Sequence, residues 1–271
     1  MKLRISLAQM DIALGEPQRN LETLKMFIDA AVVAGSDVLV LPELWSTGYI
    51  LEQAGMYASR TTEGIFAEVT QLAKKNRLHI VGSCLSLLGE NRYGNTISWA
   101  TPDGTSLGSY SKMHLFRLMD EDKYLTAGDE TAMIATPWGQ AGLSICYDLR
   151  FPELYRQYAL AGAQLIFVPA EWPHPRLNHW RTLIRARAIE NQLFVIARNR
   201  VGQAGGVSFC GHSSIVDPWG DILVEGGEEE GLFTAEIETA AVAEIRAKIP
   251  VFADRRPELY TRFVLATDSE Q

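Results

Sequence analysis

The chain has 271 residues, of which 47% are hydrophobic and 21% charged, and its formal net charge is −8. This length and composition are typical of a globular protein with enough apolar side chains for a large core. The negative net charge argues against nucleic acid as the main partner, because phosphate binding needs a basic surface.

The distribution of apolar residues and cysteines points to the cytoplasm. No apolar run approaches the roughly 18 residues that a membrane-spanning helix needs. The first residues lack the continuous apolar segment of a signal peptide. Cys84, Cys146 and Cys210 are odd in number, far apart and without C-x-x-C spacing, which disfavours a disulfide framework and a zinc site. We therefore expect a cytoplasmic protein that does not contact membranes.

The first part of the chain predicts alternating strands and helices. Residues 3–7 alternate as in a strand, and 37–41 and 78–85 are apolar runs typical of buried strands. Helical periodicity between these runs predicts helices over 17–33 and 64–76. This β-α-β-α-β order implies parallel strands with helices packed on the sheet.

The rest of the chain predicts more strands than helices. Helical periodicity indicates helices over 152–161, 178–192 and 240–248. Short runs bounded by turn residues predict strands over 95–100, 106–110, 132–136, 164–168, 193–198, 207–216, 221–224 and 232–237. Since no linker or repeat interrupts them, we expect one domain, residues 1–271. Two sheets packed face to face, each with helices on one face, would accommodate both the parallel units and the hairpins.

One stretch, AGLSICYDLRFPE, places Cys146 between a short buried strand and a helix. Leu143 and Ile145 indicate the strand, and Pro152 suits the first turn of the helix. Such a turn holds a nucleophile out from the sheet, with backbone N–H groups directed at the group it attacks. The alternative is a buried, unreactive cysteine, which is the commoner state of a free thiol.

Two further segments supply a carboxylate and a cation. Glu43 follows a predicted strand, where ligands bind in α/β sheets, and has the apolar neighbours that suit a general base. Lys112, in YSKMHLF, could stabilise an oxyanion together with the backbone N–H of Tyr147. Taken singly, Glu43 also fits a solvated loop and Lys112 a strand-end lysine that extends its amine into solvent.

Together, LPELW, YSKMHLF and CYDLRFPE resemble the Glu, Lys, Cys signature of the nitrilase (carbon–nitrogen hydrolase) superfamily. The similarity covers nearly the whole chain, with an early QMD and a later RARAIENQ and DPWG. It implies an α/β fold, a four-layer α-β-β-α sandwich with two mixed sheets packed face to face. It also implies a homodimer, with the C-terminal tail of about residues 249–271 at the interface.

The resemblance further implies a reaction. Cys146 would attack an amide carbonyl, and Glu43 would take the thiol proton and pass it to the leaving ammonia. Glu43 would then activate the water that hydrolyses the thioester. Many members carry another glutamate after the Lys motif, and Glu121 is the nearest match, with Asp120 and Asp122 as competitors.

Within the superfamily, LPELWSTGY, PAEWPHPRLNHWR and IPVFADRRPELY look most like the omega-amidase branch. That branch removes the terminal amide of small α-keto acid amides such as 2-oxoglutaramate, whose far end is a carboxylate. A carboxylate calls for a cation or hydroxyl, with Arg favoured for its bidentate geometry. We expect Tyr49 and Arg176 to hold it, and Glu171 and Trp172 to line the pocket.

Two other residues have structural interpretations. Arg150 lies close in sequence to Asp148 and Glu153, so we expect it to pair with a carboxylate and hold the turn. Cys84 lies within an apolar strand and is expected in the core.

Alternative functions remain open at this point. Nitrile hydrolysis and N-carbamoyl amino acid hydrolysis would use the same three residues. A protease-like Cys/His enzyme would use His114, His179 or His212. A non-catalytic binding protein that retains the fold is the alternative of another class. Without G-x-G-x-x-G, G-K-[ST] or H-E-x-x-H patterns, we expect no cofactor and no metal, and partners limited to an amide, water and a second copy.

Overall fold

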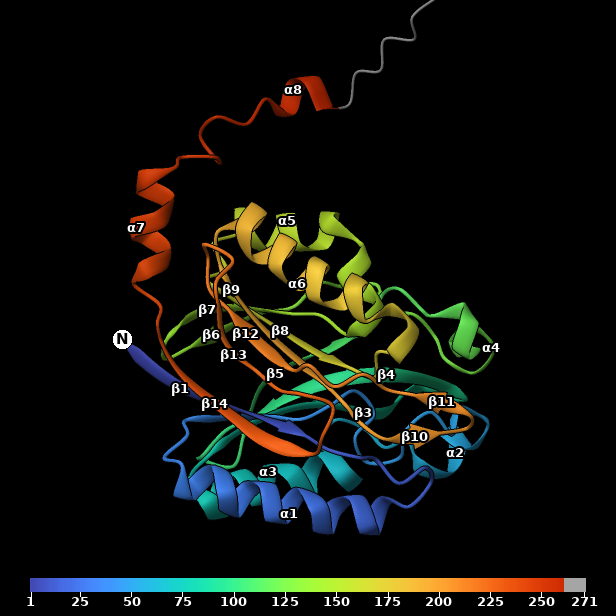
Figure 1. Ribbon diagram of the computed structural model, residues 1–271. Helices are drawn as coiled ribbons and strands as arrows, with labels where there is room; N and C mark the ends of the chain where they lie inside the picture. The colour runs from blue at the N-terminus through green and yellow to red at the C-terminus, as the bar shows by residue number, and fades with distance from the viewer. Residues whose placement is uncertain (261–271) are drawn as a thin grey trace, which may run out of the picture.

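The structure, a computed structural model that describes residues 1–260, contains two six-stranded sheets packed face to face (Figure 1). The strands of the first sheet, in spatial order, are β14 (Gly231–Glu238), β1 (Lys2–Gln9), β2 (Val38–Val40), β3 (His79–Gly89), β4 (Arg92–Ala100) and β5 (Ser106–Ser111). Those of the second are β13 (Ile222–Glu225), β12 (Ser214–Val216), β9 (Phe194–Asn199), β8 (Leu165–Ala170), β7 (Gly139–Leu143) and β6 (Met133–Thr136). The central strands β1, β2 and β3 run parallel, as do β7, β8 and β9, and the outer strands are antiparallel.

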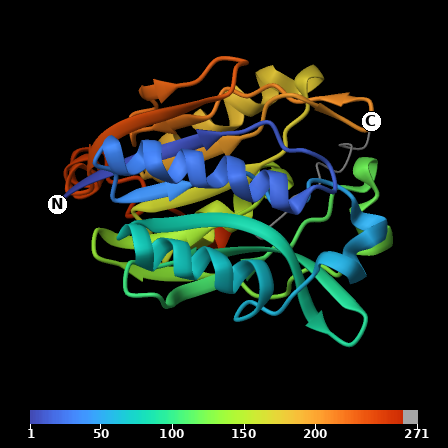
Figure 2. The ribbon, with the colours of Figure 1, turned by 90° about the horizontal axis from the view of Figure 1, so that it is seen from below.

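Helices cover the outer face of each sheet. α1 (Pro17–Val33) and α3 (Gly64–Asn76) lie side by side on the first sheet, whereas α5 (Pro152–Leu160) and α6 (Leu177–Asn191) lie on the second (Figures 1 and 2). α1 begins at a proline and is followed by Gly35 in the left-handed conformation, which ends the helix. The layers are therefore helix, sheet, sheet, helix, and the predicted α-β-β-α sandwich is confirmed.

The remaining elements are short. They are α2 (Ala54–Tyr57), α4 (Glu121–Tyr124), α7 (Ala241–Lys248), α8 (Pro257–Tyr260), the hairpin β10 (Gln203–Ala204) and β11 (Val207–Ser208), and the 3₁₀ turns η1 (Leu51–Gln53), η2 (Arg117–Met119), η3 (Cys146–Arg150) and η4 (His174–Arg176). Among the described residues, no helix combines the length and apolarity that crossing a membrane requires.

The main core fills the space between the two sheets. Leu3, Ile5 and Leu7 of β1 point into it, and the ring of Trp99 on β4 meets that of Phe167 on β8 edge to face at 4.7 Å. Each large apolar side chain removed from water contributes about 1.5–3 kcal/mol, so this layer holds the sheets together.

The sequence expectations for α1 and α3 match the structure to the residue, but the predicted strand over 207–216 is wrong. Gly211 and His212 both have positive φ, +63° and +52°, which an extended strand cannot accommodate. The segment therefore forms β11, then a turn, and then β12. The short helices α2 and α4 were also not expected, because segments of four residues carry too few periodic positions to be recognised.

The parallel strands determine where the chemistry lies. Glu43 follows β2, Glu171 follows β8, and Cys146 follows β7 by three residues. Carboxyl ends of parallel strands in one sheet lie at one edge, and the packing of the two sheets brings both edges together. Side chains from distant parts of the sequence therefore converge at one end of the sandwich.

Candidate active site

Cys146 occupies a strained turn at the start of η3. Its φ is +45°, in the left-handed region that non-glycine residues rarely adopt and that costs on the order of 1–3 kcal/mol. The carboxylate of Asp148 accepts the N–H of Ile145 at 2.9 Å and so closes the turn. The expected strand-to-helix turn is thus a 3₁₀ turn inserted between β7 and α5.

Asp148 also joins this turn to the segment that carries Lys112. Its buried carboxylate accepts the Tyr110 hydroxyl at 2.8 Å, and it lies 2.7 Å from Nδ1 of His114 and 3.1 Å from the His114 N–H. The His114 ring stacks on Phe151 with centroids 3.6 Å apart. These contacts fix the Lys112 segment and the Cys146 turn relative to each other.

The expectation for Arg150 is wrong, because the other donors already occupy Asp148. The Arg150 guanidinium lies over the Trp172 ring, 4.9 Å from its centroid, and contacts Nδ1 of His179 at 3.2 Å. Arg150 therefore faces the mouth of the site instead of holding the turn.

Lys112 bridges two buried carboxylates. Its Nζ lies 2.7 Å from Oε1 of Glu43, and 2.9 and 2.8 Å from Oε1 and Oε2 of Glu121. None of the three side chains is exposed to solvent. Glu121 begins α4, and its Oε2 also accepts the N–H of Phe116 at 2.5 Å.

The structure thus brings Glu121 to the site and not its sequence neighbours. Asp120 is exposed and pairs with Lys123 at 2.9 Å, while Asp122 is exposed as well. The left-handed conformation of Asp120, φ +59°, turns the chain so that the next residue points inward.

The electrostatics of this cluster keep the nucleophile protonated at rest. Burial raises the pKa of the Cys146 thiol well above its ordinary value, and the Glu43 carboxylate, which hydrogen-bonds to it, raises it further, while Lys112 opposes both. Burial lowers the pKa of Lys112, but Glu121 and Glu43 outweigh it and raise that pKa above its ordinary value. Lys112 therefore remains a fixed cation, and Cys146 becomes a thiolate only as a base removes its proton.

Three donors converge on one oxygen of Glu43. Oε1 accepts the Tyr49 hydroxyl and the Asn95 amide, each at 2.8 Å, in addition to the Lys112 ammonium. Oε2 accepts a main-chain N–H, that of Glu171, at 2.8 Å. With Oε1 surrounded by donors, Oε2 is the oxygen that can take a proton.

Tyr49 and Asn95 therefore belong to the carboxylate cluster. The Tyr49 hydroxyl also reaches Oε1 of Glu121 at 3.1 Å, so its polar atom faces the two buried carboxylates and not a free binding surface. The sequence analysis did not find Asn95. It enters the site because β4 pairs with β5, where the Lys112 N–H donates to the Asn95 carbonyl at 2.8 Å. A polar residue within a predicted strand was the only available signal.

A small pocket opens directly beside the nucleophile. Its lining residues are Phe116, Cys146, Tyr147, Arg150, Trp172, Pro173 and Arg176. The Arg176 guanidinium lies 5.5 Å from the centroid of the Phe116 ring, and the Trp172 indole donates to the Arg176 carbonyl at 2.9 Å. The structure thus places Trp172 and Arg176 at the pocket. Glu171 does not line this pocket as expected, because its buried carboxylate turns to Arg200 and accepts its NH1 at 2.9 Å.

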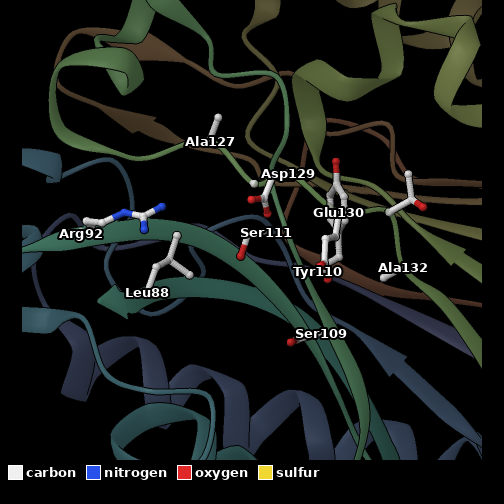
Figure 3. A pocket seen from close by; sticks show the side chains of 11 residues that line it. Leu88, Arg92, Ser109, Tyr110, Ser111, Ala127, Asp129, Glu130 and Ala132 are labelled. Carbon is white, nitrogen blue, oxygen red and sulfur yellow. The ribbon is translucent and has the colours of Figure 1, made fainter. Parts of the chain in front are cut away.

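A second, more polar pocket of about 330 Å³ lies apart from Cys146, along β5 and the segment 127–132 (Figure 3). Arg92, Asp129 and Glu130 are its charged residues, and Tyr110 forms part of its wall. None of the predicted catalytic residues lines it, whereas Cys146 lines the smaller pocket. Within residues 1–260, no three His, Cys, Asp or Glu side chains gather as metal ligands would.

Comparisons with known proteins agree with this geometry. The family model described as carbon-nitrogen hydrolase matches residues 4–247. The chain is 44% identical over 260 residues to the 2-oxoglutaramate amidase of Bacillus subtilis, which covers 96% of this chain and 100% of that one. It is 33% identical to omega-amidase NIT2 of Homo sapiens, over 95% of this chain and 96% of that one.

Solved structures extend the agreement to the fold. The CN-hydrolase superfamily protein XC1258 of Xanthomonas campestris, whose structure has an arsenic adduct in the active site, superposes with a TM-score of 0.88. It is 34% identical and the match covers 98% of this chain and 100% of that one. The resemblance noted in the sequence is therefore confirmed. The chain belongs to the carbon–nitrogen hydrolase family, and it is an amidohydrolase that acts on carbon–nitrogen bonds other than peptide bonds.

Proposed function

We propose that this enzyme hydrolyses the terminal amide of 2-oxoglutaramate, or of a similarly short amide with a carboxylate at its far end, through a thioester on Cys146. The observation that carries the proposal is the pocket beside Cys146. Cys146, Arg150 and Arg176 line it. Glu43 and Lys112 form a buried ion pair, and both act on the pKa of the Cys146 thiol. The names of the relatives in Bacillus subtilis and Homo sapiens support the same substrate class.

In the first half of the reaction, Cys146 Sγ attacks the amide carbon while its proton moves to Oε2 of Glu43. The negative charge that develops on the carbonyl oxygen is stabilised by Lys112 Nζ and the backbone N–H of Tyr147. Collapse of the tetrahedral intermediate breaks the carbon–nitrogen bond. Glu43 returns the proton to the leaving nitrogen, and ammonia departs, leaving a thioester.

In the second half, water replaces ammonia. Glu43 removes a proton from the water as its oxygen attacks the thioester carbonyl, and the same oxyanion donors act again. The carbon–sulfur bond then breaks, Cys146 regains its proton from Glu43, and the carboxylic acid leaves. Glu121 keeps Lys112 in place between the two carboxylates throughout.

Arg176 and Arg150 are the candidates for the distal carboxylate of the substrate. Within residues 1–260, neither arginine forms an ion pair, and each lies over an aromatic ring of the pocket, Phe116 or Trp172. A guanidinium stacked on a ring keeps its donor edge available for a bidentate contact with a carboxylate. Trp172 supplies an apolar wall for the methylenes between the two ends of the substrate.

The direct test is ammonia release from a panel of 2-oxoglutaramate, 2-oxosuccinamate, glutamine, an N-carbamoyl amino acid and a nitrile. We expect the two keto acid amides to give the highest kcat/KM. Arg176→Met should raise KM for 2-oxoglutaramate much more than for an uncharged short amide, since only the former offers a carboxylate. Turnover of the carbamoyl compound or the nitrile alone would overturn the proposal.

The non-catalytic alternative has its own test. Mass spectrometry of enzyme mixed rapidly with substrate should detect an acyl adduct on Cys146, and the Cys146→Ala variant should show none. Absence of both adduct and ammonia across the panel would favour a binding protein.

We further propose that residues 1–271 form one domain and that the enzyme is a cytoplasmic homodimer. Support for a dimer comes from exposed apolar side chains on or beside α5, α6 and the segment after α7, namely Leu160, Ile189, Trp219, Ile249, Leu259 and Tyr260. In Figure 1 this segment extends away from the body of the molecule. Residues 261–271 of the expected interface tail lie outside the described residues. Light scattering on the purified protein should give twice the mass of one chain. The Leu160→Glu variant, which places a charge on this apolar surface, should have a lower mass in solution.

The state of the three cysteines supports the proposed cytoplasmic location. All three are free and buried, as is usual in a reducing compartment. Cell fractionation should recover the activity with the cytoplasmic fraction.

A further inference from the structure

Arg198 is a fully buried guanidinium for which residues 1–260 supply no hydrogen-bond partner. Its Nε and both terminal nitrogens lack an acceptor, although none of the side chain is exposed. Burial lowers the pKa of this group well below its ordinary value, and the neighbouring Arg200 lowers it further. A buried charge without hydrogen bonds destabilises a fold, so its presence needs a reason.

The register of the second sheet shows where Arg198 lies. Phe167 pairs with Ile196 and Pro169 with Arg198, and side chains of paired residues in parallel strands point to the same face. Phe167 meets Trp99 of the opposite sheet. Arg198 therefore points into the layer between the two sheets, and it is the last but one residue of β9.

The carboxylate on which the Arg198 charge acts is that of Glu171, and one of its oxygens also lacks a hydrogen-bond partner. Oε2 of Glu171 accepts NH1 of Arg200 at 2.9 Å, but Oε1 has no partner within residues 1–260. Burial raises the pKa of Glu171 to about 7, Arg200 and Arg198 act in the opposite direction, and Glu43 acts with burial. The charged groups that act on Glu171 itself are Glu43, Arg198 and Arg200, and the Tyr49 hydroxyl is also near it. The two arginines in turn interact with other carboxylates, Arg200 with Asp11 and Arg198 with Glu230.

Glu171 touches the proposed base directly. Its main-chain N–H donates to Oε2 of Glu43, the oxygen that takes the thiol proton, so the position of this residue fixes that of the base. A negative charge beside a carboxylate favours its protonated form, which makes proton transfer from Cys146 to Glu43 easier.

We propose that Glu171 is a positioning residue that works in its ionised form, and that the buried charge of Arg198 serves to keep it ionised beside Glu43. Arg200 holds the Glu171 carboxylate in place through one hydrogen bond, whereas Arg198 contributes charge alone. The inference rests on the proposed Cys146–Glu43 chemistry and adds the element that sets its working pH range.

The experiment compares R198M, R198K and E171Q with the wild-type enzyme. Methionine has a similar length and no charge, and R198M removes no hydrogen bond to any of residues 1–260. We expect R198M to be more stable to heat. Its acidic limb of kcat/KM should move to higher pH by a fraction of a unit, because Arg198 lowers the pKa of Glu171 less than Arg200 does. R198K keeps the charge and should retain the wild-type limb.

E171Q provides the independent arm. It should lower kcat/KM at pH 8 about tenfold, the change that corresponds to one unit of base strength, and should abolish the limb near neutral pH. The matched control for stability is R187M, because Arg187 is also buried but donates twice to the Leu149 carbonyl and pairs with Glu190. R187M should lower the melting temperature.

The results separate this inference from the proposed function. The pH profiles are measured with an amide that the wild-type enzyme hydrolyses, and absence of any such amide contradicts the proposed function itself. Superimposable profiles for wild type and R198M overturn the role of Arg198, and a neutral limb that persists in E171Q overturns the role of Glu171. If R198M does not fold, the E171Q profile tests the role of Glu171. Retention of the wild-type limb in R198K then supports the role of the Arg198 charge, and its loss contradicts that role.

Discussion

The ammonium of Lys112 lies 2.7 Å from Oε1 of Glu43, and neither side chain has any exposed surface. A buried ion pair of this kind is a weak source of stability, because desolvation of both charges offsets most of their attraction. Its value here is geometric. It fixes the Glu43 carboxylate with a cation beside it, where the proposed reaction develops negative charge.

Replacing this cation should leave two buried carboxylates facing each other. We expect Lys112→Met to lower kcat/KM by at least about 10³-fold, since Glu43 and Glu121 would then share a proton and the oxyanion would lose a donor. Steady-state ammonia release measures this. Lys123→Met, which removes an exposed lysine paired with Asp120, is the control and should retain activity. An active Lys112→Met variant would favour the Cys/His alternative.

Tyr49 offers a test between two roles. In the carboxylate cluster its hydroxyl donates to Glu43 and Glu121, so Tyr49→Phe should lower kcat about tenfold and leave KM for 2-oxoglutaramate nearly unchanged. A residue that held the substrate carboxylate would instead show a raised KM. Tyr57→Phe is the control, because its hydroxyl donates to the Gly15 carbonyl outside the cluster.

The raised pKa of the Cys146 thiol predicts a pH dependence for its alkylation. Burial and Glu43 both favour the protonated thiol, so the rate with iodoacetamide should still be rising with pH above the range in which an exposed cysteine has levelled off. Glu43→Gln removes one of the two causes and should move the curve to lower pH. Peptide mass spectrometry distinguishes Cys146 from the buried Cys84 and Cys210. A wild-type rate that is constant from acidic to alkaline pH would contradict this account.

The Asp148 carboxylate should be important for stability. Asp148→Ala removes the acceptor of the buried Ile145 N–H and Tyr110 hydroxyl and of the half-buried His114 N–H. We expect a loss of about 3–5 kcal/mol in the free energy of unfolding. Urea unfolding followed by circular dichroism measures it. Asp122→Ala, at an exposed site, should change stability by less than about 0.5 kcal/mol. Equal effects of the two substitutions would show that Asp148 does not join the segments.

Gly128 packs against the strand that leads to Lys112. Its N–H donates to the Lys112 carbonyl at 2.9 Å, and a Cβ at this position would lie 2.2 Å from the Ser111 carbonyl oxygen. Gly128→Ala must therefore displace the backbone beside Lys112, and we expect kcat to fall about 10²-fold. Gly227→Ala, where a Cβ meets nothing within 4 Å, is the control. Unchanged kinetics in Gly128→Ala would mean that the backbone there yields without moving Lys112.

The amino-acid sequence by itself determined the family and most of the layers, and it predicted the three residues that the structure brings together, Glu43, Lys112 and Cys146. Local patterns suffice for these, because helical periodicity over 17–33 and 64–76 reports which face is buried, and LPELW, YSKMHLF and CYDLRFPE each lie within one short segment. The same locality explains the failure over 207–216, where backbone conformations at Gly211 and His212 decide the outcome and hydropathy does not record them.

Only the tertiary structure decided which polar atoms meet. Asn95 reaches Glu43 through the pairing of β4 with β5, and Arg150 turns to Trp172 because Tyr110 and His114 already occupy Asp148. Such contacts depend on the relative positions of strands far apart in sequence, to within a fraction of a hydrogen-bond length. The periodicity of a sequence shows that a side chain is buried. Which atom it forms a hydrogen bond with is decided by how the two sheets pack against each other.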